Sequence, residues 1–126
     1  NYCMLILGGP EDEEKMNAVA AGAGGRAALI PPTDDVRLYA ATLAHAAAIV
    51  CGDTLALHLA TSLGRPVVAL FGPTCRQEID GFGRMKKIVS PAPCAPCYRS
   101  ECDACPDCMD ALDASGIARA VIDLLP

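Results

Sequence analysis

Residues Ile49–Thr74, with the sequence IVCGDTLALHLATSLGRPVVALFGPT, decide the fold of this chain. The stretch opens with a short apolar run, Ile49–Cys51, continues in a helical pattern to about Leu63, and closes with a second apolar run, Val67–Phe71. Continuous apolar runs of this length are typical of strands that are covered on both faces of a sheet. Strand, helix and strand in this order predict two parallel strands joined by a crossover helix.

Turn-forming residues mark where these elements end. Gly52 stops the first strand, and Gly64 stands where a helix commonly ends in a left-handed residue. Pro66 follows two positions later and cannot continue the helix. The second strand stops at Gly72, and the turn runs on to Thr74.

Polar residues follow both strands of this unit. Asp53 and Thr54 come directly after the first strand, Thr74 follows the second, and His58 lies one helical turn beyond Thr54. Because ligands bind at the carboxyl ends of parallel strands, these positions predict a binding crevice. Exposed amides at the helix start attract a diphosphate, whereas the Asp53 carboxylate would repel one and suits sugar hydroxyls. In the alternative interpretation, Asp53 only caps the helix and His58 is a core residue.

The rest of the chain continues the alternation of strands and helices. Further strands are predicted at residues 2–7, 27–30 and 86–89, and further helices at residues 11–23, 33–47 and 115–125. Thr33 or Asp34 is expected to cap the second of these helices, and Ser115 the last. The order predicts an α/β fold with a doubly wound, Rossmann-like parallel sheet in one domain, residues 1–126. Four helical residues are expected to face the core: Met16, Val19, Val36 and Leu43.

Composition excludes some partners. The chain has 126 residues, of which 52% are hydrophobic, and a net charge of −5. Nucleic acids and anionic membranes need a basic surface, so neither is expected to be the main partner. No secretory leader and no uninterrupted apolar run of about 18 residues is visible, so the chain is expected in the cytoplasm. Because it opens almost inside a strand, we expect it to be part of a longer protein.

The central stretch resembles a known signature. Asp53-Thr54, His58-Leu59-Ala60, Leu63-Gly64 and Pro66–Thr74 are similar to the motif of glycosyltransferase family 9, the heptosyltransferases, in its C-terminal, donor-binding domain. The resemblance implies half of a two-domain GT-B enzyme that uses ADP-heptose in lipopolysaccharide core synthesis without a metal in its chemistry. It also implies that the catalytic base and acceptor site lie on an N-terminal domain that no segment here matches. The isolated chain is then expected to lack catalytic residues and turnover, and the full-length protein to be peripheral at the inner membrane.

The turn before the first helix extends the resemblance. Gly8-Gly9-Pro10-Glu11-Asp12-Glu13 is similar to the family's G-G-P-x-[DE]-x turn, in which an early acidic residue of the helix meets the nucleotide ribose. Glu11 is the implied residue and Glu13 the next choice, although acidic residues also simply complement a helix dipole. The resemblance therefore implies a donor-binding set of six residues: Gly9, Glu11, Asp53, Thr54, His58 and Thr74.

The chain departs from the family pattern at the start of the central helix. Leu55, Ala56 and Leu57 stand where the family has Gly-Pro-Met. The loss of glycine at Leu55 matters most, because a Cβ atom hinders a close approach of the backbone to a phosphate.

Five cysteines gather in the segment 91–110, called here the cysteine-rich loop, with the spacing C-x2-C-x4-C-x2-C-x2-C. Paired C-x2-C units suit a tetrahedral zinc site, and part of the spacing also fits an iron–sulfur cluster. Because the segment has few large apolar residues, burial alone cannot order it. We expect a structural zinc ion, with free or disulfide-prone thiols as the alternative. The donor crevice is expected to be indifferent to the ion, because the loop supplies none of the predicted donor contacts. The predicted ligands are Cys94, Cys97, Cys102 and Cys105, with Cys108 as the spare.

A hypothesis of a different class is a stand-alone cysteine-rich module that binds metal or performs redox chemistry. The donor-binding residues discriminate between the two, because a redox module has no need of Asp53, Thr54 or His58. If the chain is half of a two-domain enzyme, absence of the partner domain is expected to leave an uncovered apolar surface. We expect the chain to self-associate through this surface or to fill it with its own last helix.

Overall fold

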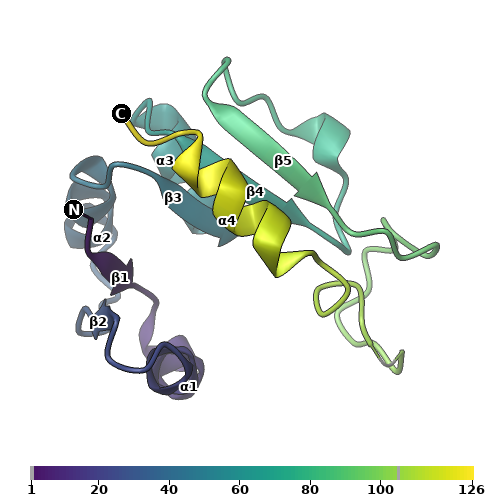
Figure 1. Cartoon of the computed structure of the whole chain (residues 1–126), viewed down its shortest axis with the longest axis horizontal. Helices are drawn as coiled ribbons and strands as arrows, with labels where there is room; N and C mark the ends of the chain where they lie inside the picture. The colour runs from purple at the N-terminus through teal and green to yellow at the C-terminus, as the bar shows by residue number, and fades with distance from the viewer. Residues whose placement is uncertain (1, 105) are drawn as a thin grey trace. The chain divides into compact units, whose positions relative to one another are not determined.

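The computed structural model of the protein describes residues 2–104 and 106–126, and Figure 1 shows its elements. The chain divides into two compact units, Asn1–Ala41 and Thr42–Pro126. Eleven elements follow one another within the described residues: β1 Met4–Ile6, η1 Pro10–Asp12, α1 Glu13–Gly22, β2 Ala27–Leu29, α2 Val36–Ala44, β3 Ile49–Gly52, α3 Leu55–Ser62, β4 Val67–Phe71, η2 Arg76–Glu78, β5 Met85–Val89 and α4 Ala114–Ile122.

The first unit contains a two-stranded parallel sheet. Strands β1 and β2 pair with Met4 opposite Ala27, and α1 connects them. Met16 of α1 is buried, and its sulfur lies so close to Gly8 that a Cβ atom built there would be 2.8 Å away. The predicted core position Val19 is wrong, because this side chain is exposed. Each strand is three residues long and gives the helix a short surface to cover.

The second unit is built on a three-stranded parallel sheet in the order β3-β4-β5. Strand β4 is central, and Val67, Val68, Ala69 and Phe71 are all buried. Consecutive buried residues on a strand require cover on both faces of the sheet. Helix α3 packs against β3 and β4, and α4 lies across β4, in front of the sheet in Figure 1. The predicted β-α-β unit and the α/β, Rossmann-like fold class with parallel strands are confirmed, with the described strands in two sheets.

The central helix ends as its sequence predicts. Leu57 and Ala60 are fully buried on its inner face. Gly64 has a φ of +65°, the left-handed conformation in which a Cβ atom is unfavourable. The amide of Arg65 then donates to the carbonyl of Ala60 at 2.9 Å, which closes the last turn.

Three predictions about helix caps are wrong. Asp35, not Thr33 or Asp34, caps α2, because its carboxylate accepts from the amides of Arg37 and Leu38. Asp113, not Ser115, caps α4, so the helix begins at Ala114. It ends at Ile122. Neither Asp53 nor Thr54 caps α3 with its side chain. The predicted core position Val36 is also exposed, because it lies in the first turn beside this cap, while Leu43 is buried.

A search for membrane spans finds no helix of sufficient length and apolar character among residues 2–104 and 106–126.

Candidate donor-binding site

The ends of β3 and β4 lie at one edge of the three-stranded sheet. The parallel register places Gly52 opposite Leu70. Asp53 and Thr54 therefore leave β3 at the edge where the turn Gly72–Thr74 leaves β4. The predicted grouping of polar residues at one sheet edge follows from this register.

Asp53 and His58 form the best-defined polar pair of this edge. His58 Nε2 lies 3.6 Å from Asp53 Oδ1, an ion pair when the imidazole is protonated. The His58 side chain is 62% exposed and the Asp53 side chain 21%. The alternative that His58 is a core residue is therefore wrong. The half-buried carboxylate and the exposed imidazole present an acceptor and a donor to solvent side by side.

Thr54 directly precedes the central helix, and its side chain does not cap the helix. Its backbone is extended, with φ −140° and ψ 178°, and its side chain makes no capping hydrogen bond. The hydroxyl is instead 3.5 Å from the carbonyl of Gly52. Since the first amides of a helix have no partner within it, this helix start retains donors for a ligand.

The departure from the family motif is divided between core and surface. Ala56 and Leu57 are buried, so these two substitutions become part of the packing between α3 and the sheet. Leu55 is 53% exposed at the first helical position. Its side chain therefore stands at the helix start that no side chain caps.

The remaining predicted donor residues, Gly9 and Glu11, lie in the first unit. Glu11 belongs to η1, and Gly9 precedes that turn. A Cβ atom built on Gly9 would lie 2.6 Å from the Glu11 carboxylate oxygens. Glycine at position 9 is therefore needed for the carboxylate to fold back against the chain. Glu13, the second choice for the ribose contact, opens α1.

The thiol of Cys51, in β3, is poorly reactive. Burial, together with a smaller effect of the neighbouring Asp53 carboxylate, raises its pKa to about 11. Because the thiolate is the nucleophile, we expect iodoacetamide at pH 8 to modify Cys51 about 100-fold more slowly than the exposed Cys94 and Cys102. Timed alkylation followed by peptide mass spectrometry measures the three rates. Equal rates would show that Cys51 is accessible and ionised like the loop thiols.

The cysteine-rich loop gives no metal site within the described residues. Cys94 and Cys102 are exposed, and Cys97 and Cys108 are half-buried. Cys105 lies outside the described residues. Among residues 2–104 and 106–126, no three His, Cys, Asp or Glu side chains gather to hold a metal ion. The zinc site, for which Cys105 was the fourth ligand, stays a prediction.

The cysteine-rich loop is attached to the sheet edge by backbone hydrogen bonds. The expectation that the crevice is indifferent to an ion bound in the loop stays a prediction. The amides of Cys97 and Tyr98 donate to the carbonyl of Pro73, next to Thr74. Sequence reasoning missed this contact because it joins segments that are far apart along the chain. The available signal was Tyr98 itself, an aromatic residue in a segment with few apolar neighbours.

Parallel strands joined by helices, with polar groups at the carboxyl ends of adjacent strands, define the class of Rossmann-like α/β proteins that bind ligands at the sheet edge. Residues 1–106 match the model of "Glycosyltransferase family 9 (heptosyltransferase)", and the chain belongs to this family. This finding confirms the resemblance seen in the motifs. It does not favour the hypothesis of a stand-alone metal-binding or redox module.

A curated relative agrees with the family. The chain is 36% identical over 99 residues to "Lipopolysaccharide heptosyltransferase 1" of Pseudomonas aeruginosa. The alignment covers 78% of this chain and 27% of the relative, so the chain spans about a quarter of the relative's length. No solved structure matches the chain at a significant level.

Proposed function

We propose that this chain binds the nucleotide-sugar donor of a glycosyltransferase, with ADP-heptose as the donor. The observation that carries the proposal is the solvent-facing pair of Asp53 and His58 beside an uncapped helix start. In this proposal the chain supplies donor binding only. The acceptor site and the catalytic base belong to the rest of a longer protein, since the chain spans 27% of its relative.

Each group at the sheet edge has a distinct role in this proposal. The first amides of α3 and the Thr54 hydroxyl hold the diphosphate, because a helix start attracts anions. His58 donates a hydrogen bond to a phosphate or sugar oxygen while Asp53 orients its ring. Asp53 accepts hydrogen bonds from sugar hydroxyls, since a carboxylate close to a diphosphate would repel it. Thr74 adds a hydroxyl from the turn after β4.

Binding of ADP by the 126-residue chain tests the proposal. We expect weak binding with a Kd of roughly 0.1–1 mM, because one domain provides part of a cleft and about 4–5 kcal/mol of binding free energy. Titration followed by two-dimensional NMR measures the affinity and locates the site at the amides of residues 53–58. A matched variant, His58→Ala, should weaken binding about threefold to tenfold, because it removes one hydrogen bond at an exposed position.

The other histidine of the chain, His45, provides a control for this titration. It is exposed in the turn directly after α2, so His45→Ala should bind ADP like the unaltered chain. Absence of any shift at residues 53–58 at several millimolar ADP would contradict the proposal. In that case Leu55→Gly tests whether the exposed leucine blocks the phosphate.

A further inference from the structure

Both halves of the cysteine-rich loop are attached to the turn that follows β4. From the first half, the amides of Cys97 and Tyr98 donate to the Pro73 carbonyl, at 3.1 Å and 2.8 Å. A carbonyl oxygen has two lone pairs, and here both have a donor. The cysteine-rich loop therefore holds the peptide group between Pro73 and Thr74 in place.

The second half of the loop packs on the preceding residue. A Cβ atom built on Gly72 would lie 2.7 Å from Cys108 Sγ and 2.8 Å from Met109 Sδ. Gly72 is itself buried. The two sulfur atoms thus rest directly on the backbone of the turn, and a larger residue at position 72 would push the loop away.

Tyr98 carries the strongest sign of a constrained role. Its φ is +54°, in the left-handed region that a bulky residue rarely adopts. Such a conformation persists where surrounding contacts over-determine it, and strained residues of this kind cluster at functional sites. Here the contacts are two hydrogen bonds. The Tyr98 amide donates to the Pro73 carbonyl, and the Tyr98 hydroxyl donates to Glu78 Oε1 at 2.8 Å.

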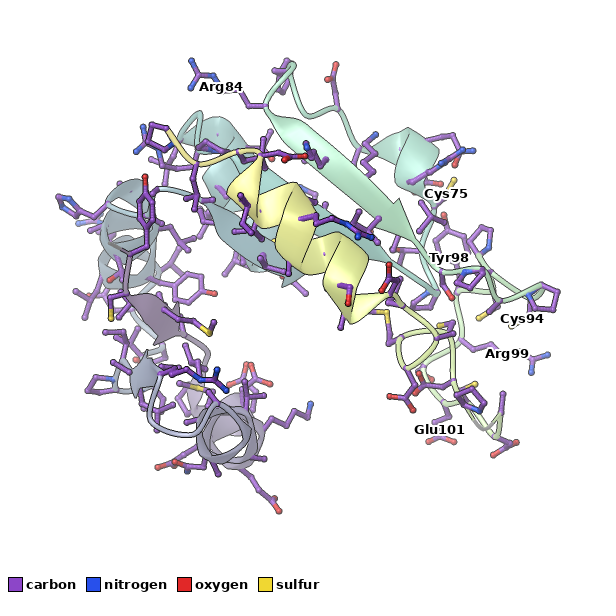
Figure 2. The ribbon with its side chains drawn as sticks, viewed as in Figure 1. Cys75, Arg84, Cys94, Tyr98, Arg99 and Glu101 are labelled. Carbon is purple, nitrogen blue, oxygen red and sulfur yellow. The ribbon has the colours of Figure 1, made fainter. Side chains whose placement is uncertain are left out.

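These contacts place Thr74 between two points of attachment. Pro73 directly precedes Thr74, and Glu78 lies in η2, which follows it. On its other side η2 is tied to the sheet, because Lys87 Nζ of β5 donates to the carbonyls of Arg76 and Ile79. Figure 2 shows that the neighbouring loop residues Arg99 and Glu101 point outward, away from this segment.

We propose that Tyr98 is a positioning residue of the donor site, and that it fixes the turn Gly72–Thr74 so that the Thr74 hydroxyl faces the ligand. The inference rests on the proposed function. The bond to Glu78 raises the pKa of Tyr98 to about 12, so the phenol stays protonated and keeps donating throughout the physiological pH range.

Four single variants of the full chain, and the double variant of Tyr98→Phe with Glu78→Ala, test this role. Tyr98→Phe removes only the hydroxyl, Glu78→Ala removes the acceptor, Glu78→Gln keeps a neutral acceptor, and Arg99→Ala is the control. We expect Tyr98→Phe and Glu78→Ala each to weaken ADP binding about threefold to tenfold, and the double variant to bind no more weakly than either. Glu78→Gln should retain most of the affinity, and Arg99→Ala all of it.

A second readout separates positioning from general stability. In the absence of ligand, Tyr98→Phe should shift the amide signal of Thr74 in NMR spectra while Arg99→Ala leaves it unchanged. All affinities are measured below the melting temperature of each variant. ADP binding by Tyr98→Phe that equals that of the unaltered chain, or an additive double variant, overturns the inference alone. No ADP binding by the unaltered chain overturns the proposed function and this inference with it.

Discussion

Replacing Phe71 with alanine is expected to lower the free energy of unfolding by about 3–5 kcal/mol. Phe71 is the last residue of the central strand β4, and none of its surface is exposed. Truncation removes most of a large apolar side chain and leaves a cavity that the two covered faces of the sheet cannot close. Urea unfolding of both proteins, followed by circular dichroism, measures the difference.

The chain offers a matched control for this substitution. Phe82 is the second of its two phenylalanines and is 76% exposed in the turn before β5. Phe82→Ala should therefore change the free energy of unfolding by less than about 0.5 kcal/mol. Equal effects of the two substitutions would show that β4 is not the core of the second unit.

The central β-α-β unit could be predicted because its signals are local and agree with one another. Two apolar runs, a helix between them and a glycine at the helix end all favour the same structure. Gly64 does adopt a left-handed conformation, and the residues predicted as the second strand form β4. The polar residues of the sheet edge follow from the same pattern, since parallel strands bring their carboxyl ends together.

Finer features depended on choices that the sequence leaves open. Thr33 or Asp34 was the expected cap of α2, and the backbone path selects the next residue, Asp35. Core positions on the first helix were predicted from spacing alone, which does not show how little surface a three-residue strand offers. In both cases, tertiary geometry decided between alternatives that a periodic pattern treats as equal.

The attachment of the cysteine-rich loop to the sheet edge was beyond prediction for a different reason. The hydrogen bond from Tyr98 to Glu78 joins residues twenty positions apart. The hydrogen bonds to the Pro73 carbonyl involve backbone groups rather than side chains. Apart from Tyr98 itself, no side-chain pattern marks such contacts. These hydrogen bonds attach the loop to the turn that contains Thr74, and the proposed positioning role of Tyr98 rests on them.

Replacing Asp53 with alanine is expected to weaken binding of ADP-heptose by about 10- to 100-fold and to change ADP affinity by less than about threefold. The proposed role of the carboxylate is to accept hydrogen bonds from hydroxyls of the heptose, the part of the donor that ADP lacks. Bonds to a charged acceptor contribute about 1.5–3 kcal/mol each. Removal of the Asp53 charge also reduces repulsion of the diphosphate. This gain in ADP affinity offsets part of any loss that the substitution causes through disturbance of the site.

Calorimetry or NMR titration with the two ligands measures this selectivity. The control is Asp123→Ala, which removes an exposed carboxylate at the C-terminal end of α4, where it pairs with Lys86 at 2.5 Å. This variant should bind both ligands like the unaltered chain. An equal loss of ADP and ADP-heptose affinity in Asp53→Ala would place the role of Asp53 in holding His58 and the start of α3. Such a structural role is open to Asp53, because its carboxylate lies 3.6 Å from His58 Nε2 and the His58 amide donates a hydrogen bond to the Thr54 carbonyl. Sugar recognition would then be assigned to another residue.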